Sequence, residues 1–202
     1  MSINLQKGQK IDLTKSNTGL SAVMVGLGWD AAEQRRGGVL GLFRSVPVTI
    51  DCDASVILCG ADGKSSVSDL VYFGNLSGAN GSVVHQGDNL TGEDDGKGDD
   101  EQIFINLSTM PKRIDKLVFV VNIYDADVKK QHFGMVENAY IRLIDTTNRN
   151  ELCRFNLSDN YDGMTGLVVG EIYRYQGEWK FSAIGQPVRE ASRLDKLLAL
   201  YQ

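Results

Sequence analysis

The fold is decided by the stretch at residues 170–184, which reads GEIYRYQGEWKFSAI. Residues 170–175 and 178–184 each form a short strand-like run. Gln176 and Gly177 separate the two runs, and a two-residue connection that ends in glycine is typical of a tight β-hairpin turn. The stretch therefore predicts two neighbouring antiparallel strands.

Similar short runs recur along the chain, separated by turn residues. They lie at residues 21–27, 55–59, 70–73, 102–106, 117–121, 139–144 and 152–155. The run at 117–121 is apolar throughout, which predicts a central strand that is buried on both faces. Strands of this number and spacing are typical of an all-β fold, and we predict a two-sheet antiparallel β-sandwich over residues 1–185.

Two segments differ from this pattern. After Pro187, apolar residues follow at helical spacing and predict a short C-terminal α-helix within residues 186–202, either packed on the sandwich or docked on a partner. These residues are Val188, Ala191, Leu194, Leu197, Leu198 and Tyr201. Residues 31–48 mix basic, glycine and apolar residues, so we expect a flexible insert that is either a plain loop or a surface that meets lipid or protein.

Composition excludes several classes of protein. The 202 residues are 42% hydrophobic and 23% charged, with a net charge of -5, which is typical of a soluble globular protein rather than a disordered chain. No apolar run approaches the roughly 18 residues of a membrane span. Residues 1–8 lack the apolar segment of a signal peptide, so we expect a cytoplasmic protein whose contact with the inner membrane, if any, is made through partners. The acidic balance argues against electrostatic binding of nucleic acid.

The negative charge is concentrated in one segment. Residues 87–101 hold seven acidic side chains, one lysine and four glycines, while the rest of the chain is nearly neutral. Glycines let such a segment fold back so that carboxylates converge, and crowded oxygen ligands suit calcium better than magnesium. Asp51 and Asp53, two residues apart in an extended stretch, place their carboxylates on one face, and Asp30 follows another strand. The alternatives are a solvated acidic turn and two solvent-facing strand residues.

Other chemistries have less support. No EF-hand pattern fits, and neither the three cysteines nor the two histidines have metal-ligand spacing or a nucleophile motif around them. A hydrolytic or small-molecule enzyme that uses the acidic cluster, or one that uses the thiols of Cys52, Cys59 and Cys153, remains an alternative. The four Asn-Leu-Ser or Asn-Leu-Thr sequences are interpreted as strand-to-turn exits.

Seven ordered motifs over residues 2–185 resemble the tellurium-resistance TerD family of bacterial stress proteins. They are Leu27-Gly28-Trp29-Asp30, Asp51-Cys52-Asp53-Ala54-Ser55, Gly81-Ser82-Val83-Val84-His85, Gly87-Asp88-Asn89-Leu90-Thr91-Gly92, Gly98-Asp99-Asp100-Glu101, Asn138-Ala139-Tyr140-Ile141-Arg142-Leu143, and Gly170-Glu171-Ile172-Tyr173-Arg174 with Gly177-Glu178-Trp179-Lys180-Phe181.

The resemblance implies a cytoplasmic, non-enzymatic, calcium-binding β-sandwich associated with resistance to tellurite, other chemical stress and phage. We expect two calcium ions and, as partners, other stress-response or membrane-associated proteins. By matching position, the implied ligands are Asp30, Asp51, Asp53, Asp88, Asp99, Asp100 and Glu101, followed by Asn75, Asn89 and Thr91. The chain departs from the family in its longer, basic linker between Asp30 and Asp51, and in a C-terminal tail without a glycine-rich ending.

Overall fold

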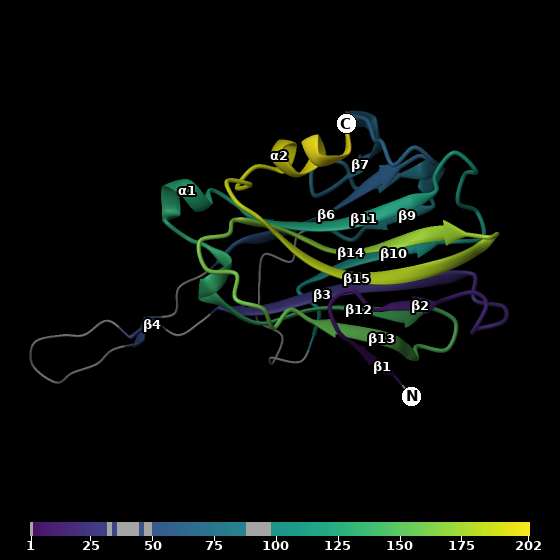
Figure 1. The fold of residues 1–202 in the computed structure, drawn as a ribbon, viewed down its shortest axis with the longest axis horizontal. Coiled ribbons are helices and arrows are strands. Elements are labelled where there is room, and N and C mark those ends of the chain that lie inside the picture. Colours follow the sequence, from purple (N-terminus) through teal and green to yellow (C-terminus); the bar gives the residue numbers. More distant parts are fainter. Residues whose placement is uncertain (1, 32–33, 36–44, 47–49, 88–97) are drawn as a thin grey trace, which may run out of the picture.

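Two β-sheets pack face to face in the computed structural model, which describes residues 2–31, 34–35, 45–46, 50–87 and 98–202 (Figure 1). Neighbouring strands are antiparallel, except that β1 pairs with β13 in parallel. The predicted all-β sandwich is therefore confirmed. The insert at 31–48 lies largely outside the described residues; within it, β4 (Gln34–Arg35) pairs with β5 (Ser45–Val46).

Within the described residues the larger sheet has seven strands. Their order across the sheet is β1 (Ile3–Leu5), β13 (Glu151–Asn156), β12 (Val136–Asp145), β3 (Ala22–Ala31), β10 (Glu101–Asn106), β9 (Val83–His85) and β8 (Ser77–Gly78). The smaller sheet has six in the same part of the chain. Their order is β2 (Lys10–Asp12), β15 (Glu178–Val188), β14 (Gly166–Tyr175), β11 (Lys116–Ile123), β6 (Cys52–Cys59) and β7 (Leu70–Val71).

The β14–β15 hairpin forms where the two strand-like runs and the glycine turn between them predict it. Gln176 and Gly177 both adopt positive φ, 53° and 84°, and such a turn matches the right-handed twist of its flanking strands. Beside β14 lies β11, which contains the apolar run 117–121 and is central in its sheet, between β14 and β6. Its alternate residues enter two different cores, which is why this strand is apolar throughout.

The main core fills the space between the sheets. Phe119 and Phe181 are among its largest fully buried side chains, together with Leu27, Ile103 and Ile141. A second core lies on the outer face of the smaller sheet, where the C-terminal segment covers side chains of β6, β11 and β14. Each sheet is therefore positioned by burial on its inner face, and the smaller one is covered on both faces.

Helices are short in the described residues, and none of them is long and apolar enough to cross a membrane. They are α1 (Ala126–Lys129), α2 (Leu194–Leu198) and the 3-10 turns η1 (Val67–Asp69), η2 (Ala79–Gly81), η3 (Phe133–Met135) and η4 (Ala199–Tyr201). The helix predicted behind Pro187 begins only at Leu194, because β15 continues to Val188, which pairs with Gly166 of β14.

Residues 189–193, which we call the C-terminal strap, lead from β15 to α2. Ala191 of the strap and Leu197 of α2 are fully buried in the outer core, together with Ile57 and Val168. Figure 1 shows α2 lying over the smaller sheet. Gly166 permits this close approach, since a Cβ there would lie 2.7 Å from the Cβ of Ala191. The apolar face of the C-terminal segment is thus packed on the domain itself.

Replacing Leu197 by alanine tests this packing. We expect Leu197→Ala to lower the free energy of unfolding by about 2–5 kcal/mol, because it removes buried methyl groups and leaves a cavity. Leu200→Ala is the control, since Leu200 in the same segment is 50% exposed and its loss should change stability by less than about 0.5 kcal/mol. Chemical denaturation measures both. Equal effects of the two substitutions would mean that the segment does not pack as described.

Candidate functional site

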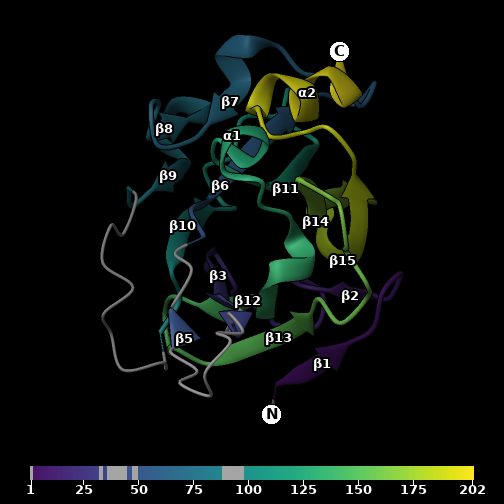
Figure 2. The same cartoon turned by 90° about the vertical axis from the view of Figure 1, so that its left-hand side faces the viewer.

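Three strand ends that carry predicted ligands meet at one end of the sandwich, the end that faces the viewer in Figure 2. The C-terminal end of β3 lies beside the N-terminal end of β10, because the two strands are antiparallel. The N-terminal end of β6 joins them from the other sheet, since the backbone N–H of Ala54 donates to Glu101 Oε2 at 3.1 Å. We call this region the acidic end.

The acidic end brings together six of the ten predicted ligands. They are Asp30, Asp51, Asp53, Asp99, Asp100 and Glu101. Asp88, Asn89 and Thr91 lie outside the described residues. Asn75 is exposed in the turn between β7 and β8, where its Nδ2 donates to the carbonyl of Leu70 at 2.7 Å, the strand-to-turn role expected of these asparagines.

Glu101 lies between the two sheets and is almost fully buried. Its Oε2 is 2.9 Å from Nε2 of His85, whose side chain has no exposed surface. The Nδ1 of His85 accepts a hydrogen bond from the N–H of Gly87 at 3.0 Å, so Nδ1 carries no proton and Nε2–H is the donor. Burial lowers the pKa of His85, but the hydrogen bond and charge of Glu101 outweigh it and the net shift is upward. The pair joins the sheets at the acidic end.

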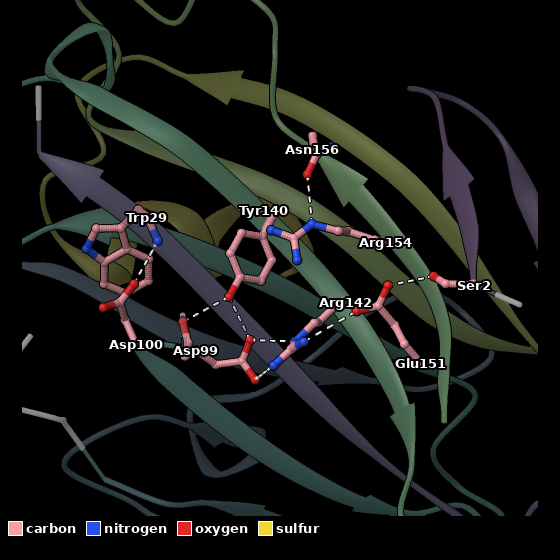
Figure 3. Close-up of polar contacts among 10 residues, drawn as sticks. Ser2, Trp29, Asp99, Asp100, Tyr140, Arg142, Glu151, Arg154 and Asn156 are labelled. Carbon is pink, nitrogen blue, oxygen red and sulfur yellow. Dashed lines mark hydrogen bonds and ion pairs between the residues drawn. The ribbon is translucent and has the colours of Figure 1, made fainter. Parts of the chain in front are cut away.

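Asp99 points in the opposite direction, onto the outer face of the larger sheet (Figure 3). Arg142 of β12 donates to both of its carboxylate oxygens, from Nε at 2.7 Å and from Nη2 at 3.0 Å, and the Tyr140 hydroxyl donates at 2.9 Å. The Asp99 side chain is fully buried, and its hydrogen bond to Arg142 raises the pKa of that guanidinium. Burial, followed by the charge of Asp99, raises the pKa of Tyr140 to about 12.

Glycines in β3 make room for this cluster. A Cβ at Gly26 would overlap the Asp99 carboxylate, and one at Gly28 would lie 2.5 Å from the Tyr140 ring. Arg154 of β13 stacks on the Tyr140 ring, with its guanidinium carbon 3.5 Å from the ring centroid (Figure 3). In the Leu27-Gly28-Trp29-Asp30 motif, Gly28 therefore has a packing role in addition to the acidic role of Asp30.

Asp30 and Asp100 occupy the rim of the acidic end. Asp100 Oδ2 accepts the backbone N–H of Trp29 at 2.7 Å, and Asp30 Oδ2 accepts Nδ2 of Asn138 at 2.7 Å. Burial raises the pKa of Asp100; the Trp29 hydrogen bond opposes this rise, while the negative charges of Asp30 and Asp99 add to it. Carboxylates that disfavour one another's charge in this way are stabilised by a cation between or beside them.

Asp51 and Asp53 flank the start of β6. Asp53 is 6% exposed, whereas Asp51 is half-exposed and its Oδ2 is 3.4 Å from Nζ of Lys129 in α1. Their charges reach the neighbouring thiol, because burial first and then Asp53 and Glu101 raise the pKa of Cys52. The potential at this end of the sandwich is therefore strongly negative.

The donor chemistry fits a hard cation, but the described acids do not form a closed site. They offer only oxygen ligands, as calcium prefers. Within the described ranges no three Asp, Glu, His or Cys side chains gather as a metal-binding group. Asp99 is paired with Arg142 and Glu101 with His85, so the oxygens best placed for a cation are those of the rim pair and of Asp51 and Asp53.

Three residues that hold these acids in the structure are not predicted as site residues from the sequence. His85, Tyr140 and Arg142 each hold an acid in place, although none is a predicted site residue. The signal for the last two is the spacing of Tyr140 and Arg142 on one face of a strand, opposite the alternating Gly26 and Gly28. Nothing in the residues around His85 predicts its pairing with Glu101.

The motifs and the geometry can now be compared with known proteins. The TerD domain model matches residues 1–201. The chain belongs to the TerD family. It is 50% identical to stress response protein SCP2 of Bacillus subtilis (strain 168) over the full length of both chains, and 48% identical to general stress protein 16U of the same organism over 92% of this chain and 90% of that protein. It is also 42% identical to tellurium resistance protein TerD of Serratia marcescens, over 92% and 91%.

Two solved structures support the fold. A crystal structure of a homologue of telluride resistance protein (TerD) from Streptomyces coelicolor A3(2) superposes with a TM-score of 0.61, covering 85% of this chain and 92% of that one at 22% identity. A second structure, of the protein SAV2460, has a TM-score of 0.58. At this identity the likeness concerns the sandwich alone.

The pairing of Asp99 with Arg142 predicts a specific pattern of stability in this TerD protein. Arg142→Gln should lower the free energy of unfolding by about 3–5 kcal/mol, because it leaves the buried Asp99 charge without its partner. Adding Asp99→Asn should recover part of this loss, since the charge is removed as well. Arg154→Gln, which loses the stacking on Tyr140, should cost only about 1 kcal/mol. Urea denaturation of the four proteins measures this; an Arg142 variant as stable as the Arg154 variant would contradict the pairing.

Proposed function

We propose that this TerD-family protein is a non-enzymatic stress-response protein that binds calcium at its acidic end and contributes to resistance against tellurite, other chemical stress and phage. The relatives named above are stress-response and tellurium-resistance proteins. The observation that carries the proposal is the rim pair at the adjacent ends of β3 and β10, where the Trp29 amide holds the carboxylate of Asp100 and Asn138 holds that of Asp30. Burial, followed by the charges of Asp30 and Asp99, raises the pKa of Asp100.

Two of the acids have a supporting role in this proposal. Asp99 is paired with Arg142, and Glu101 is paired with His85. These two clusters also hold Gly87 and Gly98, the described residues on either side of 88–97. The N–H of Gly87 donates to His85, and the carbonyl of Gly98 accepts from Tyr140 at 3.0 Å. The two ends of the segment richest in acids are therefore fixed beside the rim, which lowers the entropic cost of bringing its ligands there.

Bound calcium would supply positive charge that offsets the repulsion among these carboxylates. The chain's own residues do the rest. Asp30 and Asp100 present oxygens at the rim, Asp51 and Asp53 add oxygens from β6, and Asn138 and the Trp29 amide orient the rim carboxylates. With two ions the net charge of the chain would change from -5 to -1, and the order of the acidic end would depend on the metal.

The acidic end is also the place where we expect a partner. Tyr124 and Val128 are exposed large apolar side chains, at 46% and 81% exposure, and both lie in or beside α1. The Tyr124 N–H donates to the carbonyl of Asp51 at 2.8 Å, which ties this apolar surface to a proposed calcium ligand. A cytoplasmic stress-response or membrane-associated protein that binds here would sense the bound metal.

Thiol-based enzymatic chemistry is disfavoured by burial. Cys52, Cys59 and Cys153 are all buried. Burial raises the pKa of Cys59 to about 11 and that of Cys153 to about 12. Since the thiolate is the nucleophile, these cysteines remain protonated and unreactive at neutral pH.

Thermal melting with calcium and with EGTA tests the proposal. Calcium at a hundredfold excess over its Kd stabilises the folded state by about 2.7 kcal/mol, which raises the Tm of a domain of this size by roughly 5–10 °C. The double variant Asp30→Asn, Asp100→Asn should lose at least about half of this rise. In EGTA it should melt no lower than the unsubstituted protein, because the substitutions remove mutual repulsion.

Asp115→Asn is the matched control, since Asp115 is a partly exposed acid beside Arg174 at the start of β11, the opposite end of the β6–β11 ladder from Asp53, and should leave the calcium shift intact. An unsubstituted protein with the same Tm in calcium and in EGTA would refute calcium binding. A full shift in the double variant would show that the rim acids are not ligands.

A further inference from the structure

A cleft lies at the end of the sandwich opposite the acidic end, where the tip of the β14–β15 hairpin is seen at the right of Figure 1. Residues 60–63, in the turn after β6, form one wall, and Gln176 and Gly177 form the other. Between β6 and β14 lies β11, whose first residue, Lys116, is on the floor. Adjacent strands are about 4.8 Å apart, so the two walls stand roughly 10 Å apart. We call this space the turn cleft.

The turn cleft has the size of a small-ligand site and a polar lining. Its volume is about 550 Å³, within the range of such sites. Side chains of both charges line it, with Asp62 on one wall and Arg174 below the other. Lys116 on the floor is already paired, since its Nζ is 3.0 Å from Oε2 of Glu171. A ligand therefore meets an acid on one side of the cleft and a base on the other.

Arg174 is held rigidly at the foot of the hairpin wall. Its Nε donates to the carbonyl of Ile114 at 3.0 Å, and its Nη2 donates to the carbonyl of Met110 at 2.9 Å. Its guanidinium carbon lies 4.2 Å from the centroid of the Trp179 ring. The two carbonyls are neutral, and the carboxylate of Asp115 is 3.9 Å from Nε, beyond hydrogen-bond distance.

These contacts leave one nitrogen of Arg174 for a ligand. Nε and Nη2 form one edge of the planar guanidinium, and the carbonyls of Ile114 and Met110 occupy that edge. Nη1 lies on the other side of the group. An arginine fixed in this way binds a carboxylate at little entropic cost, because its side chain is already ordered.

Asp62 presents its carboxylate from the opposite wall. Its Oδ1 accepts the backbone N–H of Lys64 at 3.0 Å, and the N–H of Gly63 donates to the carbonyl of Gly60 at 2.9 Å. Gly63 has a φ of 76°, which glycine adopts without strain. These bonds fix the turn, and Oδ2 of the exposed Asp62 remains as an acceptor for a ligand in the cleft.

We propose that the turn cleft binds a small zwitterion of the amino-acid or dipeptide type, with its ammonium group at Asp62 and its carboxylate at Arg174. An ammonium group only donates hydrogen bonds and a carboxylate only accepts them, so such a ligand matches both walls. A simple anion would be repelled by Asp62, and a simple cation by Arg174. Two extended residues span about 7 Å, which suits walls roughly 10 Å apart from which charged side chains reach inward.

This site is independent of the proposed calcium site. The turn cleft and the acidic end lie at opposite ends of the β6–β11 ladder, in which Lys116 pairs with Cys59 and Asn122 with Asp53. Binding of the zwitterion therefore needs no metal, and its test is carried out in EDTA.

An NMR titration of the full-length labelled protein with dialanine tests the proposal. We expect the amide signals of Gly63 and Gly177 to shift until they saturate, while those of Trp29 and Gly87 at the acidic end stay in place. N-acetylalanine keeps only the carboxylate and alaninamide keeps only the ammonium group, so each should bind at least about tenfold more weakly than dialanine. Alanine is titrated beside dialanine, and the tighter of the two gives the length of the preferred ligand.

Asp62→Asn tests the ammonium side of the cleft. The asparagine keeps an oxygen for the N–H of Lys64, so the turn should persist, but the charge is lost. The Kd for dialanine should rise at least about tenfold, whereas N-acetylalanine should bind more tightly than before because its repulsion is removed. Asp159→Asn is the matched control, since Asp159 is a half-exposed acid paired with Lys7 in the β13–β14 connection, remote from the cleft, and should leave the Kd unchanged.

Three outcomes would overturn the inference while the proposed function stands. The first is a protein whose Gly63 and Gly177 signals do not respond to dialanine or to alanine. The second is equal binding of dialanine and its two singly charged analogues, which would show that the cleft does not select a zwitterion. The third is an Asp62→Asn variant that binds dialanine as tightly as the unsubstituted protein does.

Discussion

The acidic end depends on the hydrogen bonds of the buried Glu101 carboxylate. This carboxylate is shared between His85 in its own sheet and the backbone N–H of Ala54 in the facing sheet, so it fixes the distance between the sheets where their loops emerge. The same histidine accepts the N–H of Gly87, which fixes the chain as it leaves β9. A buried carboxylate is unfavourable without such partners, and the sandwich supplies them.

Asp99 and Asp100, the two acids that precede Glu101, point in different directions from it. Asp99 is drawn to Arg142 on the outer face, Glu101 to the interior, and Asp100 remains at the rim against the Trp29 amide. Three consecutive acids therefore serve three purposes, and only the middle one is left at the surface of the acidic end. The bare backbone of Gly26 makes this arrangement possible, because any side chain there would displace Asp99.

Much of the fold follows from the sequence because each strand buries a definite face. The hairpin at 170–184, the continuous strand at 117–121 and the alternating strand at 102–106 are all found where their patterns predict them. The limits are equally physical. The helical spacing behind Pro187 predicts too early a helix, since Val188 is held in a ladder with Gly166 and the strap intervenes before Leu194.

The candidate site was predictable in position but not in the roles of its residues. Period-two alternation would place Asp99 and Glu101 on one face, whereas bends at Gly98 and Asp100, before β10 begins, send them to opposite sides. The buried oxygens of Ser55 and Asn122 beside Asp53 depend on which strand pairs with β6. Pairing of distant strands is decided by tertiary packing, which a single sequence does not reveal.

An NMR titration of the isotopically labelled protein with calcium tests the central claim most directly, namely that the metal binds at the acidic end. The account predicts that amide signals of Trp29, Ala54 and Gly87 shift or sharpen, because their hydrogen bonds hold or adjoin the proposed ligands. Signals of Gly63 and Gly177, in the β6–β7 and β14–β15 turns at the opposite end of these strands, should stay in place. Spectra that do not change, or that change only at those distant turns, would contradict it.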